Sequence, residues 1–147
     1  MLQWKFKQKK PGKKTDRQKL IAKLDTVFSE FIRLRDCDDK GICKCITCGD
    51  FDHWRKVDAG HFVTRDNMAT RWEEENVHAQ CQHCNRFKSG KQYEHGLMVD
   101  KKHGPGTASK LLVKSKSACN WEEFEIETMA KYYKSAVREL KEEKGMI

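Results

Sequence analysis

No stretch of this 147-residue chain is apolar for long enough to cross a membrane. The first ten residues, MLQWKFKQKK, also lack the apolar run of a secretory signal peptide. We therefore expect no membrane partner and a protein that stays in the cytoplasm, where thiols remain reduced. The sequence shows no internal repeat and no long low-complexity segment, and its length fits one domain of ordinary size.

Acidic residues are in the minority. Lys and Arg number 30 against 22 Asp and Glu, which gives a formal net charge of +8 and favours an anionic partner, most often nucleic acid. The first 14 residues contain six lysines and no acid, and Pro11-Gly12 disfavours regular structure there. We expect residues 1–14 to form a flexible basic arm that tethers DNA, and residues 15–147 to form a single domain.

Two helices are predicted at the ends of that domain. Thr15 followed three residues later by Gln18 matches a capping box, and apolar residues at helical spacing predict a helix over 16–35 within an N-terminal flank, residues 15–36. A second apolar stripe predicts a helix over 121–144, with Asn120 as N-cap and Glu123 as the capping-box acid. The apolar stripes of these helices favour packing in the core over an interface with a partner. Between 90 and 117 the chain is polar, and only a short helix is expected, over 107–113.

Seven cysteines in a reduced compartment indicate metal binding before disulfides. Two of the cysteine pairs have CxxC spacing, and together they supply four thiolates that can surround Zn²⁺ tetrahedrally: Cys45, Cys48, Cys81 and Cys84. Four thiolates close the coordination sphere, so this zinc is expected to be structural. Cys43 and Cys45, which are separated by one residue, are a competing choice for the first pair of zinc ligands. Cys37 and Cys119 are expected to be ordinary small residues.

The chemistry-bearing residues lie between and just after the two CxxC pairs. Alternating apolar residues predict a strand over 57–63 that carries His61. A loop over 64–75 follows, then a second strand that begins near Asn76, and Asn85 stands directly after the last cysteine of the second pair. The predicted order is strand, loop, strand, cysteine pair, helix, which is an α+β arrangement.

In these motifs the sequence resembles zinc-stapled HNH nucleases, and more closely the phage recombination endonuclease family called NinG or Rap. The resemblance covers roughly residues 43–95, and its motifs are the Ala59-Gly60-His61 segment, Arg71 with Asn76, and the run from Gln80 to Gly90 that contains both Cys81 and Cys84. It implies a ββα-metal core over about 43–95 with helical flanks. It also implies hydrolysis of branched DNA such as Holliday junctions, a phage origin with location in the host cytoplasm, and phage recombination proteins as possible partners.

The predicted catalytic residues are His61, Asn76 and Asn85. A neutral imidazole at His61 suits a general base that activates water. Asn85 can offer an amide oxygen to a hard cation, Mg²⁺ or Mn²⁺, that binds the scissile phosphate. Asn76 is expected to bridge backbone groups of the loop, with an ordinary Asx turn as the alternative.

One position departs from the wider HNH pattern. Many HNH nucleases carry an aspartate directly before the catalytic histidine, where this chain has Gly60. Asp58, two residues further back, is the remaining candidate for a second metal ligand.

Basic side chains near these motifs and in the arm are predicted to contact DNA phosphates. They are Arg65, Arg71, Arg86, Lys88, Lys9, Lys10, Lys13 and Lys14. Arg86 and Lys88 are placed at a helix N-terminus, which itself favours anions. His78 and His83 are expected to make contacts around the zinc site or with solvent.

The sequence and the resemblance therefore favour a metal-dependent endonuclease that cuts branched DNA. Because junction resolution needs two symmetric nicks, we expect a homodimer. Two alternatives remain open. One is an HNH nicking or restriction-type enzyme on linear duplex DNA, and the other is a non-catalytic zinc module that binds nucleic acid.

Overall fold

The computed structural model describes residues 12–147, and residues 1–11, with Lys9 and Lys10 of the predicted arm, lie outside the described part. The chain is a mixed α+β fold with two small antiparallel sheets. Its helices and strands are, in order, α1 (Asp16–Arg35), β1 (Ile42–Lys44), β2 (Phe51–His53), β3 (Asp58–His61), β4 (Val77–Gln80), α2 (Gln92–His103), α3 (Thr107–Ser115) and α4 (Glu123–Glu143).

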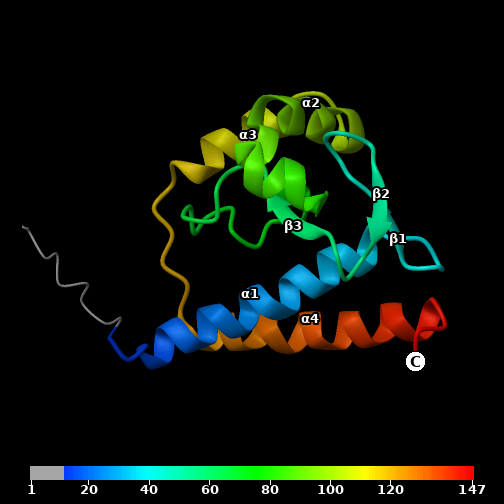
Figure 1. The fold of residues 1–147 in the computed structure, drawn as a ribbon. Coiled ribbons are helices and arrows are strands. Elements are labelled where there is room, and N and C mark those ends of the chain that lie inside the picture. The colour runs from blue at the N-terminus through cyan, green and yellow to red at the C-terminus, as the bar shows by residue number, and fades with distance from the viewer. Residues whose placement is uncertain (1–11) are drawn as a thin grey trace, which may run out of the picture.

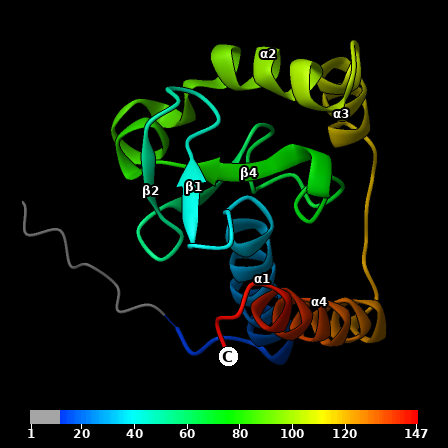
Figure 2. The same cartoon turned by 90° about the vertical axis from the view of Figure 1, so that its right-hand side faces the viewer.

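The elements form layers around the β3–β4 sheet. Helices α1 and α4 lie side by side and run in the same direction on one side of this sheet, and α2 and α3 lie on the opposite side (Figure 1). The β1–β2 hairpin lies beside the end of β4, as the rotated view shows (Figure 2). The segment that joins α1 to α4 lies against one face of the helix pair, and it contains every candidate site residue except the lysines of the predicted arm.

Helix α1 begins and ends where the sequence predicts. Thr15 Oγ1 accepts a hydrogen bond from the Gln18 backbone N–H at 3.2 Å, and Gln18 Oε1 accepts one from the Thr15 N–H at 2.9 Å. This reciprocal pair satisfies two of the donors that a helix N-terminus leaves free, and it confirms the capping box.

The predicted cap of α4 is wrong by two residues. Glu122, not Asn120, is the N-cap. The Glu122 backbone N–H donates a hydrogen bond to the Glu125 carboxylate at 2.8 Å, as in a capping box. Trp121 is held outside the helix because its indole N–H donates to the Met68 carbonyl at 3.1 Å and its ring packs near Trp72. Asn120 instead accepts a hydrogen bond from Arg17 of α1.

The apolar faces of α1 and α4 meet each other within the chain. Phe28 and Phe31 of α1 pack on the ring of Tyr133, each with ring centroids 4.9 Å apart. Val77 and Ala79 of β4 extend the same core. Both stripes are therefore core, and these faces are used within the chain.

Strands β3 and β4 pair antiparallel with Asp58 opposite Gln80 and His61 opposite Val77. The strand expected over 57–63 is shorter than predicted. The Phe62 N–H still donates to the Asn76 carbonyl in the β3–β4 register, but the Asn76 N–H donates to the Glu73 carbonyl instead of returning the bond, so β3 ends at His61. This places His61 at the last position of β3, where the loop to β4 begins.

The helix predicted after the second CxxC pair is a short one. His83–Phe87 forms a single π-helical turn, η2, closed by the Lys88 N–H on the His83 carbonyl. Gly90 then adopts φ +77°, a left-handed conformation that glycine tolerates, and the chain turns before α2 begins at Gln92. Arg86 thus lies in the second half of this short helix and Lys88 at its C-terminal end, not at the helix N-terminus where they were predicted.

Helix α2 was not expected, because its buried face carries no apolar stripe. His95, Gly96 and Val99 are its buried residues. Gly96 is needed for close packing, since a Cβ there would lie 2.8 Å from Phe62 Cε2. Helix α3 extends two residues beyond the predicted 107–113. Among residues 12–147, the structure contains no helix long and apolar enough to cross a membrane.

Candidate functional site

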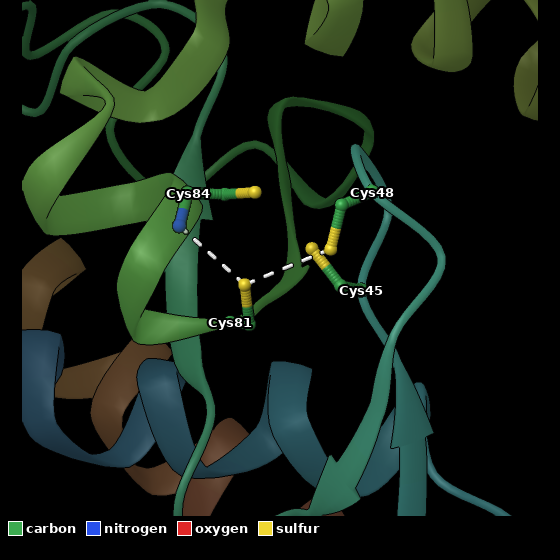
Figure 3. A group of neighbouring side chains, drawn as sticks. All are labelled: Cys45, Cys48, Cys81 and Cys84. Atoms are coloured by element: carbon green, nitrogen blue, oxygen red, sulfur yellow. Dashed lines mark hydrogen bonds between the residues drawn. The ribbon is translucent and has the colours of Figure 1, made fainter.

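Four cysteine side chains meet beside the β3–β4 sheet. Cys45 and Cys48 come from the turn between β1 and β2, and Cys81 and Cys84 follow β4. The sulfur atoms of all four lie within 4.8 Å of one another, and their thiols point into one common space (Figure 3). Cys48 Sγ and Cys81 Sγ are 3.8 Å apart. Since sulfurs bound tetrahedrally to zinc at about 2.3 Å are themselves about 3.8 Å apart, the cluster can hold such an ion.

The surroundings of the cluster favour a thiolate at Cys45. Burial raises the pKa of this thiol, but backbone hydrogen bonds at Cys48 and Cys81 and the hydroxyl of Thr47 outweigh it and bring the pKa to about 6. A thiolate is the form that coordinates metal. The donor set is soft and complete, and it leaves no position for a reacting water.

The competing cysteine register is excluded by the fold. Cys43 lies on β1 in the main core, where its thiol is directed to the Arg33 carbonyl, and burial raises its pKa to about 12. Cys37 is buried beside it, and Cys119 is partly exposed, so these two are the ordinary small residues that the sequence predicts.

His61 is held at the end of β3 in a defined orientation. Its Nε2 lies 2.9 Å from the backbone carbonyl oxygen of Arg71. Because a carbonyl only accepts hydrogen bonds, Nε2 carries the proton and Nδ1 keeps its lone pair. Burial lowers the pKa of His61 below its usual 6.5, and the positive charge of Arg65 acts in the same direction. The imidazole is therefore neutral at pH 7, with one nitrogen ready to accept a proton.

The loop that supplies the Arg71 carbonyl is braced by Asn76, which is fully buried. Its Oδ1 accepts a hydrogen bond from the Val63 N–H at 2.7 Å, and its Nδ2 donates to the carbonyls of Val63 and Thr70 at 3.0 Å each. Asn76 thus makes loop-bridging contacts rather than a simple Asx turn.

Arg71, which was predicted to contact a DNA phosphate, is bound to other residues of the chain. Its guanidinium donates to the Asp25 carboxylate, with Nε 2.9 Å from Oδ1, and also to the Arg65 carbonyl. Trp72 adds a hydrogen bond to the same carboxylate. With its donors used in this way and its side chain only 15% exposed, Arg71 fastens the loop to α1 and is not available to phosphate. Asp25 carried no signal in the sequence, because it stands among lysines on a long helix.

Asp58 and Asn85 come together although 27 residues separate them. Asn85 Nδ2 donates to Asp58 Oδ2 at 2.9 Å, and Arg86 forms two further bonds to the same carboxylate at 2.7 and 2.8 Å. Burial raises the pKa of Asp58, but these donors outweigh burial and hold the pKa below its usual value. Within residues 12–147 no hydrogen bond uses Asn85 Oδ1, whereas both oxygens of the Asp58 carboxylate accept hydrogen bonds.

The packing around Gly60 explains why this chain has no aspartate directly before His61. A Cβ at this position would lie 2.2 Å from Gln80 Oε1, so no side chain fits there. Gln80 is fully buried, and its Nε2 donates to Thr47 Oγ1 at 3.0 Å and to the Gly90 carbonyl at 2.8 Å. The glutamine amide therefore connects the first CxxC turn, β4 and the turn before α2. Asp58 lies on the same face of β3 as Gly60, because side chains two apart share a face.

His61 and Asn85 line one pocket of about 330 Å³ between α1, the loop and the turn before α2. Arg65 lines it too, and its side chain is exposed, as is that of Lys88. Lys13 and Lys14 are exposed just before α1. The pocket thus combines a neutral imidazole, a free amide oxygen and a positive charge.

His78 was expected to contact the zinc site or solvent, but its side chain contacts two other histidines instead. It is fully buried in a row of three histidines, with Nδ1 3.2 Å from His95 Nε2 and Nε2 2.8 Å from His103 Nε2. Burial, the largest cause, lowers the pKa of His78 to about 2 and that of His95 to about 4. His83 is exposed and lies near the Phe87 ring.

Comparison with known proteins gives the family of the chain. The family model described as the bacteriophage lambda NinG protein matches residues 2–143. The chain belongs to the NinG family. NinG of Salmonella phage P22 is 28% identical over 126 residues, which cover 85% of this chain and 59% of that protein. NinG of Escherichia phage lambda is 38% identical over 71 residues, 48% of this chain and 32% of that protein.

The NinG protein of Escherichia phage 933W is likewise 38% identical over 71 residues, 48% of this chain and 33% of that protein. The chain therefore spans less than two thirds of the NinG relatives it matches. No solved structure matches it.

Proposed function

We propose that this NinG-family chain is an HNH-type, metal-dependent DNA endonuclease in which His61 is the general base. The observation that carries the proposal is the pocket lined by both His61 and Asn85. Among residues 12–147, no hydrogen bond uses Nδ1 of His61 or Oδ1 of Asn85. A β3–β4 hairpin followed by α2 supplies the ββα order of elements expected of this class.

In the proposed reaction, His61 Nδ1 takes a proton from a water molecule as the water oxygen attacks the scissile phosphorus. The bond from phosphorus to the 3′ oxygen breaks, and the 3′ oxygen acquires a proton from solvent. The products carry 5′-phosphate and 3′-hydroxyl ends. The Arg71 carbonyl keeps the imidazole in the tautomer that can accept the proton.

Asp58 and Asn85 are the residues that would hold Mg²⁺ or Mn²⁺. Both offer oxygen, and Mg²⁺ needs only one or two protein ligands besides water. Asn85 would ligate through Oδ1, and Asp58 would exchange its bonds with Arg86 for the ion. When bound, this ion would stabilise the charge on the phosphate and the leaving oxygen. The four-cysteine cluster is proposed to hold zinc with a structural role only, since its donor set is closed.

Branched DNA, such as a Holliday junction, is the proposed substrate. This part of the proposal rests on the resemblance to the NinG or Rap recombination endonucleases and not on the shape of the pocket. A homodimer and an association with phage recombination proteins are part of the same proposal.

The test compares cleavage of a four-way junction, a fork and a linear duplex of matched length, with Mg²⁺ present. Cuts near the branch point of the first two substrates support the proposal. Equal cutting of all three would retain the nuclease and overturn the preference for branches. Tight binding without cleavage under Mg²⁺ or Mn²⁺ would leave a zinc-dependent DNA-binding module.

A further inference from the structure

A second groove lies beside the His61 pocket and includes Asp58 in its lining. Its volume is about 610 Å³, and it shares Ser29, Ala59, Arg65 and Asn85 with that pocket. The two hollows are therefore adjacent, and a DNA strand bound in the first lies within reach of the second.

Four arginines line this groove and come from four different elements: Arg33 from α1, Arg55 from the turn after β2, Arg65 from the loop after β3, and Arg86 from η2. Asp58 is the single acidic residue in the lining, and it is already paired with Arg86. The lining thus has an excess of three positive charges. Convergence of elements from distant parts of the chain distinguishes it from a charge run on one exposed helix.

Trp54 packs against two of these arginines, Arg33 and Arg55. Its ring is buried, and the guanidinium carbons of Arg55 and Arg33 lie 4.6 and 5.5 Å from the ring centroid. Arg33 is further anchored by hydrogen bonds of 3.1 Å to the carbonyls of Trp54 and Ser29. Stacking on an aromatic face holds a guanidinium without using its N–H donors.

Arg55 is the residue that this arrangement leaves ready for a ligand. Within the described residues 12–147, no hydrogen bond or ion pair engages the guanidinium of Arg55 or Arg65. Both side chains are exposed. Arg55 is therefore oriented by Trp54 with its donors available, which is suited to bidentate contact with a phosphate.

We propose that this arginine groove binds backbone phosphates of the DNA strand that leaves the His61 pocket, with Arg55 on Trp54 as the remote phosphate contact. The inference rests on the proposed function for its choice of DNA as ligand. It adds a binding site outside the reacting centre, and the contacts are independent of base sequence because phosphates carry no sequence information.

The experiment measures binding of a labelled four-way junction by zinc-loaded protein, without added Mg²⁺, by fluorescence anisotropy from 50 to 200 mM NaCl. Arg55→Gln is expected to reduce the slope of log Kd against log salt by about 0.9, the loss of one phosphate contact, and to weaken binding about five- to tenfold at 100 mM salt. Arg55→Lys keeps the charge and should retain the wild-type slope with a smaller loss of affinity.

Arg138→Gln is the matched control. Arg138 is exposed on α4 and pairs with Glu142 of the same helix, so its loss should leave slope and affinity as in wild type. If Arg55→Gln behaves like Arg138→Gln, the arginine groove is wrong, whether or not the protein cuts DNA. If Arg55→Gln lowers the slope but wild type does not cut with Mg²⁺, the groove stands and the nuclease proposal fails. Absence of wild-type binding would overturn both.

Discussion

Asn85 and Asp58 are joined by a hydrogen bond of 2.9 Å that connects the turn after the second cysteine pair to the strand that carries His61. The bond uses the amide nitrogen of Asn85, a residue that lines the pocket with His61, and within residues 12–147 no hydrogen bond uses its amide oxygen. A cysteine cluster that orders η2 therefore also sets the position of Asn85 relative to His61. This connection is how a structural zinc would support catalysis without taking part in it.

Replacement of Asn85 by alanine is expected to lower the Mg²⁺-dependent cleavage rate by about 100-fold or more, because it removes one of two oxygen ligands of the proposed ion. Asp58→Ala should weaken Mn²⁺ binding measured by isothermal titration calorimetry. Asn67→Ala, on the loop after β3, is the control and should keep the wild-type rate. An Asn85→Ala enzyme with wild-type activity would show that Asn85 is not a metal ligand.

Loss of Asn76 should destabilise the fold. The alanine variant leaves the buried N–H and C=O of Val63 and the C=O of Thr70 without their side-chain partner. We expect the free energy of unfolding to fall by roughly 3 kcal/mol. Urea denaturation with zinc present measures this, and Asn67→Ala, whose bonds lie on the loop surface, should cost about 1 kcal/mol or less. Equal losses in the two variants would refute the bracing role.

Zinc content should depend on the four clustered cysteines alone. The purified protein is expected to contain one zinc per chain by elemental analysis, and Cys81→Ser should lose most of it. Cys119→Ser should retain it. A strong chelator should unfold the wild-type core, because binding energy at such a site contributes directly to folding. Full zinc in Cys81→Ser, or an unchanged circular dichroism spectrum after chelation, would contradict this prediction.

The buried histidine row should make stability sensitive to acid. The folded pKa of His95 is lowered to about 4, so between pH 6.5 and 4 the unfolded state binds more protons than the folded state. The contribution of His95 to the free energy of unfolding is therefore complete above pH 6.5. It is lost as the pH falls toward 4, by up to about 1.4 kcal/mol per pH unit.

The measurement is the difference in unfolding free energy between pH 6 and pH 5, compared between wild type and His95→Phe. Both proteins keep the cysteine cluster and Asp36, which faces His78, so the acid sensitivities of those groups are common to both. The variant should show the smaller loss. Identical losses would mean that His95 does not titrate as described.

Gly60 and Gln80 should be energetically coupled. Gly60→Ala forces a methyl group against Gln80 Oε1 and is expected to cost about 2 kcal/mol or more. In a Gln80→Ala background the same substitution should cost at least about 1 kcal/mol less, which a double-mutant cycle measures. Additive effects would show that the contact does not constrain position 60.

Features set by neighbouring residues could be predicted from the sequence. The Thr15–Gln18 cap and the register of Cys45 with Cys48 depend on spacing along the chain, and both are as expected. The Asp25–Arg71 pair and the packing of Gln80 on Gly60 depend on contacts between distant segments, which one sequence does not reveal. Helix α2 was missed because histidine and glycine form its buried face, where a periodicity argument looks for leucine or valine.

The central claim, that His61 activates water for DNA cleavage, is tested most directly by the cleavage rate of His61→Ala with Mg²⁺ on a four-way junction. His83→Ala, which changes an exposed histidine beside the cysteine cluster, is the control, and zinc content and DNA affinity are measured for all three proteins. We predict that His61→Ala binds DNA and zinc like wild type but cuts about 10²- to 10⁴-fold more slowly, while His83→Ala cuts normally. Wild-type cleavage by His61→Ala would contradict the account.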